Sequence, residues 1–386
     1  MRVTFIAQIL NQKRKTGLGN YAHDLINTLS EVSPRNEHTC LINQLSSKFS
    51  ADVHFKSKAV KVINTHLPGR LFYASLIGGR NFFPLDFFIG QSDIVHYLHP
   101  PHALPWQLSG KAIMTVHDLL LEFYPELRTP ENLYLYKNLP KIVKKVERII
   151  ADSHSTKKDI VKTFHLSEEK VSVVHLGIGE SFKPVGDLRI IQKTLSYYHI
   201  NAPFILYLGA LAPHKNIIRL LKAFVLVVKR KYGAVQLVVA GEKHWDYQNI
   251  IQEVQNLGLK DKVIFTGYVK DKDRPTLYSA ASVFAYPTLY EGFGLPVLEA
   301  FACGSAVVTS NISSIPEIAK DAALLVDPEN HVEIAKAISS ILDNKKLRLK
   351  LSQKAIQKAS NFTLAKMAQE TLKVYENVLL EGRRNK

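Results

Sequence analysis

The stretch "ASVFAYPTLYEGFGLPVLEAFACGSAVVTS" (residues 281–310) contains a complete strand–helix–strand unit. Its two ends, residues 281–288 and 305–310, are short apolar runs of the length expected for buried strands. Between them, Pro296 suits the first turn of a helix, where its missing N–H costs nothing, and a glycine-containing loop at 291–295 precedes it. Because strands joined by a helical crossover run parallel, this stretch predicts an α/β fold.

The same alternation fills the rest of the chain and falls into two sets. In the first set the predicted strands are "RVTFIA", "DIVHYL", "AIMTVHD", "RIIADS" and "VSVVHL". In the second set they are "FILYLGAL", "VQLVVAGE", "KVIFTGYV", "ASVFAYPT", "SAVVTS" and "AALLVD". The two sets predict two doubly wound, Rossmann-like domains over residues 1–185 and 200–365, with a linker near 182–200. An amphipathic helix with no following strand ends the chain at 366–386.

The composition is that of a globular protein with an excess of positive charge. The chain has 386 residues, of which 46% are hydrophobic and 22% charged, and its formal net charge is +16. The length is appropriate for two domains. The charge favours anionic partners, whether phosphates, an acidic membrane surface or nucleic acid, without choosing among them.

Cysteine usage and hydropathy indicate a reducing, cytoplasmic setting. Cys40 and Cys303 are the two cysteines, which is too few for a disulfide framework or a cysteine-rich metal site. The N-terminal "MRVTFIAQIL" lacks a cleavage-site pattern and is interpreted as a first strand, not as a signal peptide. No apolar stretch reaches the ~18 uncharged residues that a spanning helix needs.

Two glutamates in the opening stretch, Glu291 and Glu299, are separated by seven residues. Glu291 precedes the glycine-containing loop and Glu299 lies one turn into the predicted helix. The backbone N–H groups between them, at the positive end of a helix dipole, suit a phosphate or a sugar hydroxyl. A carboxylate can accept two hydrogen bonds from neighbouring hydroxyls, so the pattern suggests a sugar on Glu291 and a ribose on Glu299. The structural alternative, a tight turn with a capping acid, has equal weight on this stretch alone.

The stretch "LYLGALAPHKNI" strengthens the ligand interpretation. Gly209 follows a predicted strand, and Lys215 comes six residues later, just before a helix predicted to start near Asn216. A lysine there can act as a point charge on a diphosphate. A solvated lysine is the alternative, but the dipole disfavours a cation at a helix start.

Together these motifs resemble those of the retaining glycosyltransferases of family 4, which have the two-domain GT-B fold. The similarity rests on "EGFGLPVLEAFACGSAVVTSNISSIPEI", "LGALAPHKNI", "VVAGE", "FTGYV" and "ADSHSTKKDI", in that family's order. "VHYLHPPHALP" and "TVHDLLLEFYPE" are typical of its bacterial mannosyltransferase-like members in surface polysaccharide synthesis. The resemblance implies two domains facing a cleft, acceptor-binding over 1–185 and donor-binding over 200–365, with the helix 366–386 crossing back to the first.

The resemblance also implies roles for individual residues. Glu291 would hold the hydroxyls of the donor sugar, Glu299 would hold the ribose, and Lys215 would neutralise the departing diphosphate. Catalysis would involve Glu291, Lys215 and His117, the last lying near the reacting carbon and the sugar 6-hydroxyl. The other implied donor-site residues are Gly292, Phe293, Gly294, Leu295, Gly209, His214, Tyr268 and Val269, with Gly17 and Gly19 in a flexible loop beside the phosphates. Phe293, Gly294 and Leu295 would act through backbone amides, and Tyr268 and Val269 would lie along the base.

Two positions depart from the family pattern, and they bear on how the diphosphate is held. His214 stands where many members carry an arginine, and Ala210 where some carry a basic residue.

Retention of configuration normally suggests a carboxylate nucleophile, but the sequence offers no convincing one. The implied mechanism is therefore reaction on one face, with the leaving phosphate helping to deprotonate the acceptor. Closure of the two domains would exclude water.

Other patterns carry less weight. Asp271 and Asp273 resemble a metal-binding pair but are interpreted as a charged loop, and His96, His99 and His102 lack the cysteines or acids that would complete a zinc site. No metal or other cofactor is therefore expected.

The segment "YKNLPKIVKKVERII" has two predicted faces. Its basic face holds Lys137, Lys141, Lys144, Lys145 and Arg148, and its apolar face holds Ile142, Val143, Val146 and Ile149. This segment could dock on anionic lipid, together with an aromatic stretch at 71–90, but a solvated helix over a domain core is the somewhat favoured interpretation.

The leading hypothesis is a metal-independent retaining glycosyltransferase that transfers a hexose from a nucleotide sugar to a glycan or lipid-linked acceptor. Mannose from GDP-mannose is the first choice of donor. The alternatives are a UDP-sugar-dependent transferase of the same fold, a nucleotide-sugar 2-epimerase and a non-catalytic sugar-nucleotide-binding clamshell. Nucleic-acid binding is suggested by charge alone, since nothing resembles a base-reading module. The protein is expected in the cytoplasm, with peripheral contact at the inner face of the membrane as a further option.

Overall fold

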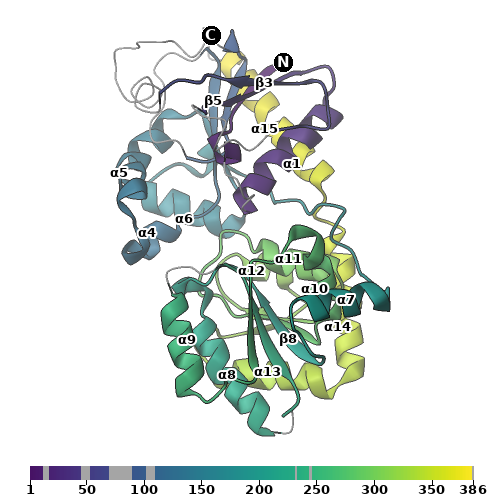
Figure 1. Cartoon of the computed structure of the whole chain (residues 1–386). Coiled ribbons are helices and arrows are strands. Elements are labelled where there is room, and N and C mark those ends of the chain that lie inside the picture. Colours follow the sequence, from purple (N-terminus) through teal and green to yellow (C-terminus); the bar gives the residue numbers. More distant parts are fainter. Residues whose placement is uncertain are drawn as a thin grey trace. The chain divides into compact units, whose positions relative to one another are not determined.

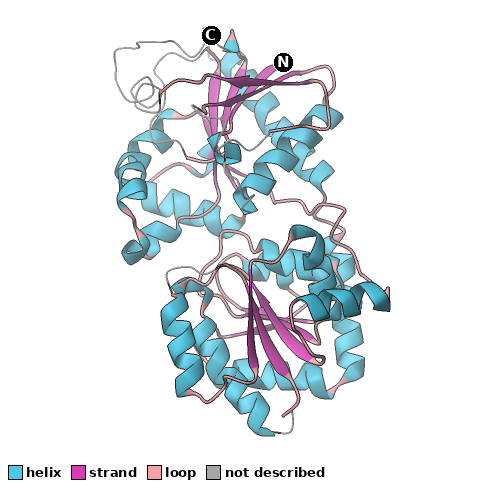
Figure 2. Ribbon diagram, viewed as in Figure 1, coloured by secondary structure: helices cyan, strands magenta, loops and turns pink. Residues whose placement is uncertain are grey.

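The structure is a computed structural model that describes residues 1–11, 17–44, 53–68, 89–100, 109–230, 233–242 and 246–384. The chain forms two compact units (Figure 1). The N-terminal unit comprises Met1–Gly177 and Leu364–Lys386, and the C-terminal unit comprises Ile178–Thr363. Each unit has its own parallel sheet with helices on both sides (Figure 2). The predicted pair of Rossmann-like domains is therefore confirmed.

The sheet of the N-terminal unit has seven strands in the order β3-β2-β1-β4-β5-β6-β7, all paired in parallel. Its central strands are buried apolar runs, as expected for a parallel sheet covered on both faces. The strands are β1 (Arg2–Ile6), β2 (Glu37–Ile42), β3 (Val60–Asn64), β4 (Ile94–Tyr97), β5 (Lys111–Val116), β6 (Arg148–Ala151) and β7 (Val171–Val173).

The helices of the N-terminal unit include one from the far end of the chain. The final helix α15 (Leu364–Arg384) packs against α1 (Gly17–Val32), as predicted for a C-terminal helix that crosses back. Helix α6 begins where Ser153 caps it by accepting a hydrogen bond from the Thr156 N–H. The remaining helices among the described residues of this unit are η1 (Gln8–Asn11), α4 (Leu120–Phe123), η3 (Pro125–Leu127), α5 (Pro130–Lys145), α6 (His154–Phe164) and η4 (Glu168–Lys170).

The sheet of the C-terminal unit has six parallel strands in the order β10-β9-β8-β11-β12-β13. The chain winds outward from β8 through β9 to β10, then returns to the other side of β8 at β11. The gap between the carboxyl ends of β8 and β11 is thus the topological switch point, where open α/β sheets bind ligands. The strands are β8 (Phe204–Leu208), β9 (Gln236–Ala240), β10 (Val263–Gly267), β11 (Val283–Tyr286), β12 (Val307–Ser310) and β13 (Leu324–Val326).

Several helices of the C-terminal unit begin at capping side chains. Asn330 accepts hydrogen bonds from the N–H groups of Val332 and Glu333, and Asn344 accepts one from Leu347. The helices are α7 (Leu188–Tyr197), η5 (Pro213–Lys215), α8 (Ile217–Arg230), α9 (Tyr247–Asn256), η6 (Asp271–Asp273), α10 (Arg274–Ala280), α11 (Leu295–Ala302), α12 (Ile315–Ala319), α13 (His331–Asp343) and α14 (Lys345–Ala359).

The structure corrects two boundaries drawn from the sequence. The predicted linker at 182–200 belongs to the C-terminal unit and contains helix α7, whose first turn is capped by Asp187; the change of unit falls at 177–178. The basic helix predicted through Arg148 and Ile149 ends at Lys145, and both residues belong to β6. A short bend at 146–147 separates the end of α5 from the start of β6, so Arg148 does not extend the basic face of the helix.

No helix within the described residues is long and apolar enough to cross a membrane. His102 and nearly all of the aromatic stretch 71–90 lie outside the described residues, so the structure does not address the predictions made for them.

Candidate functional site

The switch point of the C-terminal sheet brings together the two residues that the sequence placed on a diphosphate and a sugar. Lys215 follows β8 at the end of η5, and Glu291 follows β11. The Lys215 Nζ donates to Glu291 Oε1 at 2.5 Å, although the residues are 76 positions apart. Both side chains are largely buried, with 14% and 10% of their surfaces exposed. A charge pair so poorly solvated is expensive to form, which favours a role beyond stability.

Two tyrosines complete the polar wall around this pair. The Tyr286 hydroxyl donates to the same Glu291 Oε1 at 2.8 Å, and its ring lies 5.5 Å from the Lys215 ammonium. Tyr207 stacks on Tyr286 and donates its hydroxyl to the Ala210 carbonyl. Burial raises the pKa of Glu291, but the Lys215 charge and its hydrogen bond outweigh it and hold the pKa below its ordinary value. Glu291 is therefore ionised at neutral pH.

The backbone of Glu291 is fixed from the opposite side. Ser313 and Ser314 donate their hydroxyls to the Glu291 carbonyl at 2.7 and 2.9 Å, and the Glu291 N–H donates to Ser313 Oγ. The His214 carbonyl accepts from the Leu289 N–H at 2.7 Å, which ties η5 to the segment after β11. His214 is buried, and its positive charge when protonated would add to that of Lys215 in lowering the pKa of Glu291.

The loop of Gly292, Phe293 and Gly294 leads into α11, which starts at Leu295. Gly294 is the N-cap residue and has a φ of 105°, a region that favours glycine. A Cβ at this position would lie 2.7 Å from the Ile315 side chain. With no side chain at the cap and Pro296 in the first turn, the start of α11 offers backbone N–H groups and the positive end of its dipole.

A second close approach shapes the β8 side of the switch point. Gly241 has a φ of 155°, and a Cβ there would lie 1.9 Å from the Gly209 carbonyl oxygen. A Cβ at Gly209 would in turn lie 3.0 Å from the Tyr207 hydroxyl. The "VVAGE" and "LGAL" segments therefore meet backbone to backbone, and a larger residue at either glycine would displace the segment that leads to Lys215.

Glu299 is also held by one cation and one tyrosine. It projects from α11 and accepts hydrogen bonds on Oε2 from the Arg274 guanidinium and from the Tyr278 hydroxyl, the latter at 2.8 Å. Burial raises the pKa of Glu299 above its ordinary value even though Arg274 and Tyr278 both act to lower it. The sequence predicted Glu299 as a site residue but gave no signal for Arg274, which precedes it by 25 positions.

The segment predicted to lie along a base follows β10. Tyr268 is 42% exposed, whereas Val269 is buried. The Tyr198 hydroxyl accepts from the Lys270 N–H and donates to Asp273 Oδ2 at 2.9 Å, so the end of α7 fixes this segment. Asp273 is therefore engaged by a tyrosine, and Asp271 lies 3.6 Å from Arg274; the two acids form η6 where a charged loop was predicted.

In the N-terminal unit, His117 directly follows β5 and is almost fully buried. Its Nδ1 lies 2.7 Å from Asp152 Oδ2, and its Nε2 lies 2.9 Å from the Leu98 carbonyl oxygen. Burial lowers the pKa of His117, but Asp152 and the Leu98 bond outweigh it, so the pKa is raised. With acceptors on both nitrogens, the ring donates from both when it is protonated. Asp152, missed from the sequence, keeps a buried Oδ1 with no partner among the described residues.

Gly17 and Gly19 differ from their prediction as a flexible loop. They form the first turn of α1, and Gly19 is buried. The predicted loop itself, residues 12–16, lies outside the described residues. The helix persists through both glycines because the following residues supply an apolar face toward the core.

A buried polar network in the same unit was not foreseen. His96 Nδ1 lies 2.6 Å from the Tyr375 hydroxyl, and His96 Nε2 lies 2.8 Å from Thr115 Oγ1, which also contacts the Tyr21 hydroxyl. Burial lowers the pKa of His96 to about 3, so its ring is neutral. His96 thus fastens α15 to β4 and β5, and it is a core histidine.

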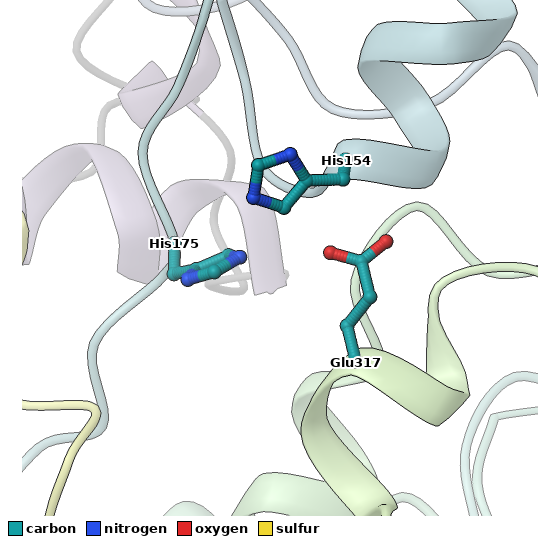
Figure 3. Close-up of side chains that lie close together, drawn as sticks. All are labelled: His154, His175 and Glu317. Carbon is teal, nitrogen blue, oxygen red and sulfur yellow. The ribbon is translucent and has the colours of Figure 1, made fainter.

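Two further histidines lie side by side in the N-terminal unit (Figure 3). His154 opens α6 and His175 follows β7, and their rings pack edge to face with centroids 5.8 Å apart. Glu317, drawn in the same figure, stands in the first turn of α12 in the C-terminal unit.

Comparisons with known proteins agree with this architecture. The family model described as Glycosyltransferase Family 4 matches residues 16–182, and the model described as Glycosyl transferases group 1 matches residues 199–358. O-antigen chain mannosyltransferase B of Escherichia coli is 29% identical over 281 residues, which cover 72% of this chain and 74% of that protein. Serotype-specific mannosyltransferase WbdA of Escherichia coli is 28% identical over 300 residues, 76% of this chain but only 36% of that longer protein.

Solved structures share the fold over nearly the whole chain. Sucrose-phosphate synthase from Thermosynechococcus elongatus superposes with a TM-score of 0.77 at 20% identity, covering 99% of this chain and 100% of that one. Anabaena HepE, solved in complex with UDP and glucose, superposes with a TM-score of 0.73 at 18% identity, covering 97% and 99%. At these identities the likeness concerns the fold alone.

Proposed function

Because this chain belongs to the family 4 glycosyltransferases with the GT-B fold, we propose that it transfers mannose from GDP-mannose to a growing glycan, with retention of configuration. The observation that carries the proposal is the buried Lys215–Glu291 pair at the switch point, beside the start of α11. The mannosyltransferase relatives favour the sugar, and O-antigen chain mannosyltransferase B favours an O-antigen type of surface polysaccharide as the acceptor.

In the proposed reaction each group has a defined task. The bond between the sugar C1 and the diphosphate breaks, and the growing negative charge is stabilised by Lys215 and by the N-terminus of α11. Glu291 holds sugar hydroxyls and thereby orients C1. The acceptor oxygen forms its bond to C1 on the same face, and its proton passes to the departing phosphate. We propose that no metal ion is required, so turnover should persist in excess EDTA.

The donor base is the finer part of the proposal, and UDP is the competing choice because HepE, a protein of the same fold, was solved with UDP. The test is a thermal-shift comparison of GDP, UDP and ADP. A ligand at ~100 times its dissociation constant adds ~2.7 kcal/mol to stability. Stabilisation by GDP would support a GDP-sugar donor, and stabilisation by UDP would replace it. If none of the three shifts the transition, the donor site at Lys215 and Glu291 is wrong.

Turnover distinguishes transfer from the other activities of such a site. Wild-type protein with GDP-mannose and a polysaccharide-intermediate acceptor should release GDP and extend the glycan. Epimerised donor without glycan extension would instead indicate an epimerase. Binding of the nucleotide with neither product would indicate a non-catalytic binding protein.

We also propose that α5 contacts the cytoplasmic membrane surface, which would bring the enzyme to a lipid-linked acceptor. Lys137, Lys141, Lys144 and Lys145 are exposed, while Ile142 on the opposite face is buried in the core. Four exposed lysines on one helix suit anionic lipid.

The cysteines bear on the compartment in which the protein works. The buried cysteines Cys40 and Cys303 are free thiols, as suits a reducing compartment.

The membrane proposal is tested by sedimentation with vesicles of phosphatidylcholine alone or with phosphatidylglycerol. Glutamine at the four α5 lysines should abolish binding to the anionic vesicles. The matched control replaces Lys345, Lys346, Lys350 and Lys354, which are exposed on α14. Equal losses in both variants would mean that net charge alone, and not α5, determines binding.

A further inference from the structure

We propose that Arg274 is a positioning residue for the donor: it fixes Glu299 so that one carboxylate oxygen is presented to the ribose hydroxyls. The inference rests on the proposed function and names a residue that sequence reasoning did not find. It concerns the C-terminal unit alone, in which both residues lie.

The geometry divides the two oxygens of Glu299. Arg274 Nη2 and the Tyr278 hydroxyl both donate to Oε2, and no described residue donates to Oε1. A carboxylate oxygen has two lone pairs, so Oε2 is saturated while Oε1 can accept up to two hydrogen bonds. Because Oε2 is held from two directions, the carboxylate cannot rotate freely, and Oε1 is preorganised for a ligand.

Glu291 shows the same division, which supports a ligand-directed interpretation. Lys215 and Tyr286 both donate to its Oε1, and no described residue donates to Oε2. Each of the two glutamates is thus held by one basic side chain and one tyrosine on a single oxygen. For Arg274 and Glu299, an ion pair serving stability alone would gain more from a fork-to-fork contact that uses both carboxylate oxygens.

Arg274 is itself held in place and has little access to water. Its side chain is 17% exposed, its guanidinium carbon lies 5.3 Å from the centre of the Phe182 ring, and Nη1 lies 3.6 Å from Asp271 Oδ1. Its Nε is buried without a partner among the described residues. A buried nitrogen without a hydrogen-bond partner costs free energy. This cost indicates that the contact with Glu299 sets the position of the Arg274 side chain.

Arg274 also connects the ribose contact with the segment predicted for the base. It opens α10 directly after η6, which follows Tyr268 and Val269, and Tyr198 fixes that segment at Lys270 and Asp273. Loss of the guanidinium would leave Glu299 buried, with Tyr278 as its one remaining donor among the described residues. The carboxyl would then become protonated or turn, and in either case Oε1 would cease to be a fixed, charged acceptor.

The test measures the preference for a ribose that carries its hydroxyls. The dissociation constants of GDP and 2′,3′-dideoxy-GDP, or of the UDP pair if UDP is the nucleotide that binds, are measured by calorimetry. Wild-type protein should prefer the ribonucleotide by about tenfold or more, as for a hydrogen bond to a charged group. Arg274→Gln should bring the ratio close to one, and Arg274→Lys should leave it intermediate, because lysine keeps the charge and loses the fork.

A double variant keeps the test independent of folding. Arg274→Gln in a Glu299→Gln background removes both members of the buried pair, so no uncompensated charge remains. If Arg274 acts through Glu299, the double variant should have the same nucleotide ratio as Glu299→Gln alone. Lys272→Gln, which removes an exposed charge two residues away in η6, should retain the wild-type ratio.

The outcomes separate this inference from the proposed function. If wild-type protein binds neither nucleoside diphosphate, the proposed function fails and the inference fails with it. If wild-type protein binds the nucleotide and prefers the ribose but Arg274→Gln keeps that preference, the inference alone is overturned, and the pair is structural. Wild-type binding without any ribose preference would overturn the role given to Glu299.

Discussion

The Lys215–Glu291 pair makes a prediction whose size and pH dependence follow from its burial. Lys215→Met keeps the volume of the side chain and removes its charge, which leaves the Glu291 carboxylate 10% exposed with Tyr286 as its donor. Breaking a buried pair on one side costs about 3–5 kcal/mol, and we take about 3 because both side chains retain some exposure. For a domain of this size that lowers the melting temperature by about 6–12 °C.

The sign of the pH dependence distinguishes this effect from ordinary loss of packing. In the wild type the pKa of Glu291 is lowered, so the pair stabilises the fold above the unfolded pKa, and that contribution is lost as pH falls through the folded pKa. In Lys215→Met, burial without a cation raises the pKa of Glu291, so its cost is absent at acid pH and grows as pH rises. The difference between wild type and variant should therefore be large at pH 7.5 and smaller at pH 5.

Differential scanning calorimetry at both pH values provides the measurement. The matched control is Lys222→Met in the same unit, where the lysine is 47% exposed and lies 3.8 Å from Glu253; it should change stability by under about 0.5 kcal/mol. Lys215→Met combined with Glu291→Gln should recover most of the loss. If Lys215→Met is no worse than Lys222→Met, or if its effect is the same at both pH values, the buried charge pair is not what the structure indicates.

Three other substitutions test the remaining features. Glu291→Gln removes the charged acceptor for the sugar hydroxyls, so we expect release of nucleoside diphosphate to slow by about a hundredfold or more. Gly294→Ala introduces a Cβ at a φ of 105° and 2.7 Å from Ile315, and it should destabilise the protein by about 1–3 kcal/mol in thermal unfolding. His117 has a raised pKa, so the stability it provides is present below its unfolded pKa and is lost as pH rises through the folded pKa. His117→Gln leaves Asp152 buried without its cation. Its free energy of unfolding, measured by urea denaturation, should therefore fall further below the wild-type value at pH 6 than at pH 9.

Each of these expectations can fail in a specific way. Wild-type turnover in Glu291→Gln would remove that residue from the site. An unchanged melting temperature in Gly294→Ala would mean that the start of α11 adjusts without strain. A pH-independent loss in His117→Gln would mean that the imidazole is neutral in the folded protein.

The sequence predicted most of the fold because parallel strands are continuous apolar runs, but it missed β2 and β3. In β3, Lys61 and Val62 are exposed and the strand lies at the edge of the sheet, so its pattern is interrupted by polar residues. In β2, Glu37 and His38 precede the apolar end and resemble a turn. Edge strands and half-polar strands lose the continuous run on which the prediction depends.

The predicted site residues were single positions, and their partners were not predictable in the same way. Lys215 and Glu291 were each predicted at the site, but nothing local indicated that they pair across 76 positions, or that Arg274 reaches Glu299 across 25. Asp152, which holds His117 across 35 positions, carries no local signal either. The Lys215–Glu291 and His117–Asp152 contacts are set by strand order, which joins β8 to β11 and β5 to β6, and the Arg274–Glu299 contact by the packing of α10 on α11. A single sequence contains neither arrangement explicitly.

The pairing of Lys215 with Glu291 changes how the two predicted roles relate to each other. Taken separately, a lysine for the diphosphate and a carboxylate for the sugar would each have to be kept buried and charged at its own cost. Paired, each is the counter-ion of the other, so the site maintains both charges without a ligand partner. In the proposed function, a diphosphate would draw the Lys215 ammonium toward itself while sugar hydroxyls donate to Glu291 Oε2, the oxygen to which no described residue donates. Under that proposal the donor would meet two charges that are already buried and paired, so its binding would not require the desolvation of two isolated charges at the switch point.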